Sequence, residues 1–182
     1  MNDNVLIGSG RFGDVYLISK HICEKRISYC ETYEELNNLR KIQGLYGIPK
    51  VYKINIYRNI SFIGEMKKGA YRGVFNSCIG KYVKRGKGMG IEMEYLGRYN
   101  LDMYEMIIEK ENELALQKIL FNAFYISYLI YLKTGLNHSD LHRKNVIIQK
   151  QKPFQKTYYI GKYKYVLKNQ KYKVSVIDFD SM

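Results

Sequence analysis

The first third of the chain alternates hydrophobic with polar residues in short runs, a pattern typical of strands. Residues 5–18 and 22–27 are rich in β-branched and aromatic side chains, and three glycines interrupt the first run. Such side chains favour strands, and a glycine cluster between two runs favours a tight turn. The pattern therefore predicts strand, glycine turn and strand over residues 5–18, and a further strand over residues 22–27.

The next segment, residues 33–43, has apolar residues at helical spacing. Thr32 is a suitable N-cap, Glu35 stands three residues after it as in a capping box, and Gly44 follows the last apolar position, Ile42. A polar cap at one end and a glycine at the other are the usual limits of a helix. We therefore predict a helix that ends at Gly44.

A longer helix is predicted over residues 114–133, because apolar residues recur there every three or four positions up to Gly135. They occupy more than one face, so we expect this helix to be buried. The remaining predicted elements are strands over residues 50–56, 89–95, 146–148, 157–160, 163–168 and 171–177, a short helix over residues 101–109, and an irregular insertion over residues 61–88 with one short strand at residues 78–83.

Composition limits the class of protein. The 182 residues can form one large domain or two small lobes, and 46% hydrophobic residues with 19 Tyr and 7 Phe exclude a disordered chain. Three cysteines without metal-ligand spacing predict reduced thiols in an intracellular, cytoplasmic protein, with a nuclear location left open. We identify no apolar run near the ~18 residues of a membrane span and no signal peptide at the start.

The formal net charge of +13 is unevenly distributed. Seven Lys or Arg and no acid lie between Met66 and Gly90, and ten with no acid lie between Leu141 and Ile177. Such stretches suit nucleic acid or an acidic partner. Because charge runs alone are weak signals, we favour a solvated basic surface near a site for a polyanionic nucleotide.

Gly8, Gly10 and Gly13 form a G-x-G-x-x-G pattern, which is shared by dinucleotide-binding folds and kinases. In the dinucleotide-binding fold the third glycine opens a helix, whereas here it leads into Asp-Val-Tyr-Leu-Ile, which favours a strand. A glycine-rich hairpin lets backbone N–H groups approach phosphates. Val15, two residues after the last glycine, could then cover an adenine ring. The pattern favours the kinase type of loop.

Lys25 lies in the next predicted strand, where a kinase needs a cation for the α- and β-phosphates. Cys23, two residues earlier, would point the same way as a small apolar residue against adenine. Glu35 in the predicted helix is the carboxylate that we expect to pair with Lys25. The alternatives are that Lys25 is one of many surface lysines and that Glu35 serves only as a cap.

The stretch HSDLHRKN, residues 138–145, carries the strongest chemical signal. Asp140 and Asn145 lie five residues apart, and Asp178 follows a later apolar strand. In phosphoryl transfer one carboxylate orients the attacking hydroxyl, while an Asn and a second Asp hold Mg²⁺ on the nucleotide. The alternative is a polar turn followed by an unrelated strand, which the order of His138, Asp140, Asn145 and Asp178 makes less favourable.

Together these segments resemble the eukaryotic-type protein kinase superfamily. The passage ELNNLRKIQGLYGIP, residues 35–49, and the segment MEYLG, residues 93–97, look like the helix-to-strand passage and the hinge of the casein-kinase-I and vaccinia-related kinase group. The DLH triplet at residues 140–142, and the long Tyr- and Lys-rich segment after Asn145, are more similar to haspin-like kinases. Small-molecule kinases share the DLH triplet.

The resemblance implies an α+β, protein-kinase-like fold of two lobes. A β-rich N-terminal lobe would cover residues 1–97, including the insertion over residues 61–88 and the hinge at residues 93–97. A truncated, mainly helical C-terminal lobe would cover residues 98–182. Leu39, His138 and Phe179 would belong to an internal apolar column.

The resemblance also implies roles for single residues, with ATP and Mg²⁺ as cofactors. Asp140 becomes the catalytic base, with His142 in the same loop; Lys25 binds phosphates and is held by Glu35; Asn145 and Asp178 ligate Mg²⁺. The other residues that it assigns to the ATP site are Gly8, Gly10, Gly13, Val15, Cys23, Met93 as gatekeeper, Glu94 and Leu96 at the hinge, and Ile147 below the adenine.

Three departures from the family pattern bear on activity. Ser139 replaces an Arg that commonly contacts a phosphorylated activation loop, and Asp180 replaces a Gly. The printed sequence also has only two residues after Asp180, so we expect no activation segment or later helices. We expect the apolar surface of the long helix to be covered by a partner protein, by a second copy of the chain, or by the segments over residues 61–88 and 150–175 folded back over it.

The leading hypothesis is an ATP-dependent kinase acting on Ser or Thr hydroxyls of a protein substrate. The second is a kinase-like module that binds nucleotide or a protein without turnover. A small-molecule kinase comes third. A nucleic-acid-binding protein is possible but not favoured, because it leaves the ordered motifs unexplained.

Overall fold

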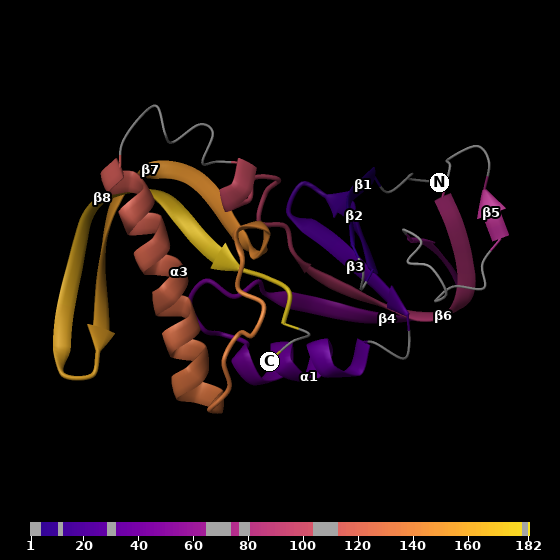
Figure 1. Ribbon diagram of the computed structural model, residues 1–182, viewed down its shortest axis with the longest axis horizontal. Helices are drawn as coiled ribbons and strands as arrows, with labels where there is room; N and C mark the ends of the chain where they lie inside the picture. Colours follow the sequence, from indigo (N-terminus) through magenta and orange to yellow (C-terminus); the bar gives the residue numbers. More distant parts are fainter. Residues whose placement is uncertain are drawn as a thin grey trace. The chain divides into compact units, whose positions relative to one another are not determined.

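The computed structural model describes residues 5–10, 13–28, 32–64, 74–76, 81–103, 113–179 and 182. These residues form an α+β protein with antiparallel sheets and few helices (Figure 1). The chain divides into two compact units. Unit 1 comprises Met1–Leu39 and Lys50–Tyr95, and unit 2 comprises Arg40–Pro49 and Leu96–Met182.

Unit 1 is built on a six-stranded antiparallel sheet with the order β1-β2-β3-β6-β4, in which β5 pairs with β6. The predicted hairpin and third strand are confirmed. Helix α1 follows them and begins and ends within a residue of the prediction. The elements are β1 (Val5–Gly10), β2 (Gly13–Ser19), β3 (Ile22–Ser28), α1 (Thr32–Ile42), β4 (Val51–Gly64), β5 (Val74–Asn76) and β6 (Lys81–Glu94).

The prediction of an irregular insertion over residues 61–88 is wrong for its described part. Strands β4 and β6 pair along their length, from Val51 with Met93 to Gly64 with Tyr82. Backbone hydrogen bonds between antiparallel strands do not require an alternating side-chain pattern, so a Gly- and Lys-rich sequence can form them. The short strand predicted at 78–83 coincides with β6 from Lys81 onward, and residues 65–73 and 77–80 lie outside the described part.

Unit 2 consists of helix α3 (Glu113–Thr134) packed on the hairpin of β7 (Val146–Ile160) and β8 (Tyr163–Val176), with the short 3-10 turn η1 (Arg143–Asn145) before β7. The predicted strands over 146–148, 157–160, 163–168 and 171–177 are therefore parts of two long strands. With strands of 15 and 14 residues against a helix of 22, the described part of residues 98–182 is not mainly helical, which corrects the prediction. The predicted helix over 101–109 is helical over 101–103, and residues 104–112 are outside the described part.

Helix α3 is buried along one face only, whereas the sequence predicted a fully buried helix. Its buried residues are Ile119, Asn122, Ala123, Ile126 and Ile130. Apolar residues on the rest of its surface are exposed, including Phe124 at 66% and Leu132 at 61%. A hairpin covers only one side of a helix, so spacing alone could not show which apolar residues would be covered.

By length and composition α3 is also long and apolar enough to cross a membrane, with no other such helix among the described residues. This is weak evidence, because core helices of soluble proteins meet the same criterion. The absence of a membrane span therefore stays a prediction.

The segment Arg40–Pro49 belongs to unit 2 because its backbone contacts that unit. Gly47 accepts a hydrogen bond from the Val176 N–H at 2.9 Å, and Gln43 accepts one from Lys133 Nζ at 3.0 Å. Gly47 has φ +78°, and a Cβ there would clash with Ile126 of α3. Only glycine fits this close approach.

A buried polar network joins α3 to the hairpin. The Tyr158 hydroxyl lies 2.7 Å from Asn122 Oδ1 and 3.0 Å from Gln170 Oε1, and Asn122 Nδ2 donates to Gln170 Oε1 at 2.8 Å. Tyr46 adds its hydroxyl at 3.2 Å from Asn122 Oδ1. Buried polar side chains normally find such partners, and together they specify one register of hairpin on helix.

Lys156 stands at the edge of this network, with its ammonium over the ring of Tyr46. Burial, with a smaller effect of Lys173, lowers the pKa of Lys156 from 10.5 to about 7. Below pH 7 the amine is charged in both the folded and the unfolded chain, so the cost of burying the charge is fully present. Between pH 7 and 10.5 only the unfolded chain keeps the proton, so the free energy of unfolding rises with pH.

We therefore expect the stability of Lys156→Met relative to the parent protein to be most favourable at pH 6 and to fall by pH 9, measured by urea unfolding. Because the side chain is only half-buried, solvent screening reduces the size of the effect. Lys162→Met, on the exposed turn of the hairpin, controls for the loss of a lysine. If the difference in the free energy of unfolding between Lys156→Met and the parent protein is the same at pH 6 and pH 9, the lowered pKa of Lys156 is contradicted.

Candidate functional site

Lys25 and Glu35 form the ion pair that the sequence predicts. Lys25 Nζ lies 2.9 Å from Glu35 Oε1 and 2.8 Å from Oε2, and the two side chains are only 13% and 3% exposed. Glu35 reaches the strand from the first turns of α1. A buried pair of this kind holds an ammonium in one position, with its remaining N–H groups directed elsewhere.

One face of the unit 1 sheet collects four of the predicted site residues. Val15 is the cross-strand partner of Lys25, and Cys23 is the partner of Met93. Cys23 and Lys25 are two residues apart on β3, so all four side chains lie on the same face. Burial raises the pKa of the Cys23 thiol to about 11, which leaves it protonated and unreactive at neutral pH.

The three predicted glycines lie on the β1–β2 hairpin, where Gly8 pairs with Val15 and Gly10 with Gly13. Gly13 has φ +147°, and a Cβ there would clash with the backbone carbonyl of Arg26. Ser9 Oγ donates to Asp14 Oδ1 at 2.6 Å and ties the two strands together. Residues 11 and 12, which connect the strands, lie outside the described part.

The predicted hinge divides at the boundary of the units. Glu94 ends β6 in unit 1, where its N–H donates to the Lys50 carbonyl at 2.8 Å and its carbonyl is 3.8 Å from Cys23 Sγ. The Tyr95 N–H donates to the His21 carbonyl at 2.9 Å. Leu96 is buried in unit 2.

In unit 2, residues 138–145 form a loop that is fixed to the segment carrying Asp178. Asn145 Nδ2 donates to the Asp140 carbonyl at 3.0 Å, and the Ile177 N–H donates to the Asn145 carbonyl at 3.0 Å. His138 Nε2 lies 3.0 Å from the Ile177 carbonyl and therefore carries the ring proton of a neutral imidazole. Three hydrogen bonds thus bring Asp140, Asn145 and the residue before Asp178 into one arrangement.

Asp178 has φ +69°, in the left-handed region that a non-glycine residue rarely occupies. Such backbone strain persists only where the surroundings impose it, and it gathers at functional sites. On one side the Ile177 N–H is held by Asn145. On the other, the Phe179 ring is buried and contacts His138 edge-on, with centroids 5.2 Å apart. Asp180 is outside the described residues.

Asp140 and His142 face each other across the loop. His142 Nδ1 accepts the Lys144 N–H at 3.2 Å, so the proton of the neutral ring is on Nε2, the atom 3.7 Å from Asp140 Oδ2. Both side chains are about half exposed, at 49% for Asp140 and 50% for His142. The carboxylate is therefore accessible to a substrate, and the imidazole lies beside it.

Asn145 and Asp178 carry oxygen donors of the kind that divalent cations prefer. With Asn145 Nδ2 bonded to a carbonyl, Oδ1 is the acceptor that the amide can offer, and Asp178 supplies a carboxylate; hard cations such as Mg²⁺ prefer these oxygens and keep several waters. The described residues contain no cluster of three or more His, Cys, Asp or Glu side chains that could hold a metal ion by themselves. Ile147, predicted to lie below an adenine, is buried in β7.

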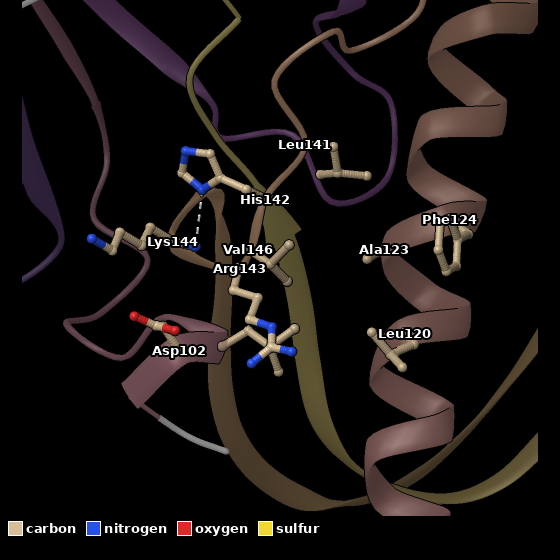
Figure 2. A pocket seen from close by; sticks show the side chains of 10 residues that line it. Asp102, Leu120, Ala123, Phe124, Leu141, His142, Arg143, Lys144 and Val146 are labelled. Carbon is tan, nitrogen blue, oxygen red and sulfur yellow. Dashed lines mark hydrogen bonds between the residues drawn. The ribbon is translucent and has the colours of Figure 1, made fainter. Parts of the chain in front are cut away.

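An open cavity of about 610 Å³ lies beside this loop (Figure 2). Helix α3 forms one side of it, and the loop with the first residue of β7 forms the other. The lining is mainly apolar, with Arg143 and Lys144 as basic residues and Asp102 as an acidic one; the residues are Leu101, Asp102, Leu120, Ala123, Phe124, Leu141, His142, Arg143, Lys144 and Val146.

Sequence reasoning missed Glu24, which is 1% exposed on the opposite face of β3 from Lys25. Burial opposes its ionisation, but hydrogen bonds from Tyr57, Asn55 and Arg26 outweigh burial and lower its pKa. Gly90 leaves room for it, because a Cβ there would clash with Glu24 and Tyr57. The strict alternation along β3 was the available signal, since it places Glu24 and Arg26 together. This cluster holds β3 against β6 and β4.

The chain matches no protein-family model and no curated protein sequence. Its function is therefore inferred from the chemistry of the residues described above.

Proposed function

We propose that the protein is an ATP-dependent kinase of the protein-kinase-like, two-lobe type, which transfers the γ-phosphate of ATP to a Ser or Thr hydroxyl. The observation that carries the proposal is the bonded arrangement of Asp140, Asn145 and Ile177, next to Asp178 in its left-handed conformation. A carboxylate, an amide and a second carboxylate held in that order are the groups that phosphoryl transfer needs.

Lys25 would bind the α- and β-phosphates. Its ammonium is held by Glu35 on a largely buried face, so it loses little freedom when it meets an anion. Gly8, Gly10 and Gly13 have no side chains that could obstruct a phosphate approaching the hairpin backbone. Val15, Cys23 and Met93 offer an apolar surface for adenine on the same sheet face as Lys25.

Asn145 and Asp178 would hold Mg²⁺, which when bound neutralises the charge on the phosphates. The half-exposed Asp140 would accept a hydrogen bond from the acceptor hydroxyl and orient its lone pair toward the phosphorus. His142 Nε2 lies 3.7 Å from that carboxylate. Little covalent chemistry is asked of the protein; positioning and electrostatics supply the rate.

A second function, a binding module without turnover, is favoured by the cavity beside α3. Its mainly apolar lining, with two basic residues and one acidic residue, suits an amphipathic protein segment, and Phe124 is 66% exposed there. Exposed apolar surface of this kind commonly marks a partner site.

One experiment on the purified chain separates these functions. Thermal unfolding with Mg·ATP, with Mg²⁺ alone and with neither measures nucleotide binding, and γ-labelled ATP with acidic and basic protein substrates and with small hydroxyl compounds measures transfer. We expect a rise in the melting temperature with Mg·ATP, following RT ln(1 + [L]/Kd), together with transfer to protein. Binding without transfer to any acceptor supports the binding module, transfer only to small compounds supports a small-molecule kinase, and no binding at saturating Mg·ATP overturns the proposal.

A further inference from the structure

The hairpin of β7 and β8 stays in contact with α3 as far as its turn, where the Gly161 N–H donates a hydrogen bond to the Tyr128 hydroxyl at 3.1 Å. Its strands of 15 and 14 residues continue to a turn at Gly161 and Lys162 (Figure 1). Between Lys150 and Lys173 the sequence contains eight lysines and no acidic residue. Nothing in the proposed phosphoryl transfer uses this part of the chain.

The register of the hairpin separates its two faces. Tyr158 pairs with Tyr165 on the face toward α3, where Tyr158 is fully buried and meets Phe121 and Tyr125 edge-on at 5.1 and 4.9 Å between ring centroids. Directly opposed residues of an antiparallel pair share a face, and the next pair faces the other way. The pair of Tyr159 and Lys164 therefore faces away from α3, and Tyr159 is 59% exposed.

The turn adds a second aromatic residue beside a lysine. Tyr163 is 58% exposed, and Lys162 Nζ lies 5.5 Å from the centroid of its ring. Tyr159 is thus exposed on the outer face with Lys164 as its cross-strand partner, while Tyr163 pairs with Ile160 on the other face and is exposed at the turn beside Lys162. We call these four residues, Tyr159, Lys162, Tyr163 and Lys164, the hairpin tip.

We propose that the hairpin tip binds single-stranded nucleic acid. Bases stack on the exposed faces of Tyr159 and Tyr163, and phosphates meet the lysines beside them. Stacking on aromatic rings next to cations is the way in which proteins bind single strands with little sequence preference. An acidic protein surface would use the lysines but would gain little from the tyrosine faces. A duplex offers phosphates but keeps its bases stacked inside, so the rings favour the single strand.

The test is fluorescence anisotropy of the full chain with labelled dT16 and rU16, a 16-bp DNA duplex and a polyglutamate peptide of similar charge, over a range of KCl concentrations. The double variant Tyr159→Ala with Tyr163→Ala removes the two stacking rings. The double variant Tyr159→Phe with Tyr163→Phe keeps the rings and loses only the hydroxyl groups. Lys162→Gln with Lys164→Gln removes two cations. Tyr52→Ala is the matched control, because Tyr52 of unit 1 is 47% exposed and has Lys50 Nζ 5.4 Å from its ring centroid.

We expect the double Ala variant to bind dT16 at least about tenfold more weakly, and the Phe variant and Tyr52→Ala to bind as the parent does. The double Gln variant should lower the slope of log K against log[salt] by about 1.4, at about 0.7 for each phosphate contact. The relative affinity for dT16 and rU16 identifies DNA or RNA as the better ligand.

Three results would overturn the proposal. Equal binding of polyglutamate and dT16 would show a general surface for acidic partners, and preference for the duplex would show that stacking is not used. Loss of binding in Tyr52→Ala equal to that in the double Ala variant would show that the hairpin tip is not the site. Circular dichroism of each variant confirms folding. If the double Ala variant does not fold, the double Gln variant still tests the site, with the double Phe variant as its folded reference.

Discussion

Asp140→Ala is expected to reduce phosphoryl transfer by about 10²- to 10⁴-fold while leaving the binding of Mg·ATP nearly unchanged. The carboxylate is half exposed and acts on the acceptor hydroxyl, whereas the loop around it is held by backbone atoms and by Asn145. Because Asn145 bonds to the carbonyl of Asp140 and not to its side chain, the substitution should not disturb the metal ligands.

Asp140→Asn tests the same point with the shape retained, since an amide cannot accept a proton at neutral pH. Glu113→Gln is the matched control, because it also removes one exposed carboxylate from unit 2, at the start of α3. This variant should transfer phosphate as the parent protein does. The measurement is the initial rate of label transfer at saturating Mg·ATP, with thermal shifts recorded in parallel. If Asp140→Ala retains the parent rate, Asp140 is misassigned.

Lys25→Met is expected to have two large effects, on nucleotide binding and on stability. It removes the cation for the phosphates, so the rise in melting temperature with Mg·ATP should disappear. At a hundredfold excess of ligand over Kd that rise corresponds to about 2.7 kcal/mol. It also leaves Glu35, which is 3% exposed, without its cation, and breaking a buried pair in this way costs about 3–5 kcal/mol.

The double variant Lys25→Met with Glu35→Gln separates the two effects. It no longer buries an unpaired charge, so it should recover most of the stability without recovering the response to nucleotide. Lys53→Met, which removes an exposed lysine of the same sheet, should behave as the parent in both measurements. Chemical unfolding gives the stability and thermal shift gives the response. A double variant that still responds fully to Mg·ATP would remove Lys25 from the binding site.

Local elements were predictable where a local rule decides them. Side-chain alternation placed the strands before residue 28. Helix α1 ends at Ile42, two residues before Gly44, and α3 ends at Thr134, directly before Gly135; the two glycines have φ +83° and +72°. These are properties of a few neighbouring residues: a left-handed residue ends a helix, and glycine adopts that conformation at little cost. The pairing of Lys25 with Glu35 was expected from the family resemblance, and no local rule would have shown it.

The sequence by itself thus determined most of the short elements and singled out the residues that we propose to carry chemistry. Only the tertiary structure decided that β4 and β6 pair through the predicted insertion, that β7 and β8 are continuous strands, that α3 leaves Phe124 exposed, and that Glu24 is buried opposite Lys25. Strand length, register and burial depend on partners far along the chain. The same holds for Asp178, because the hydrogen bond from Ile177 to Asn145 and the packing of Phe179 on His138 help to hold its strained backbone in place.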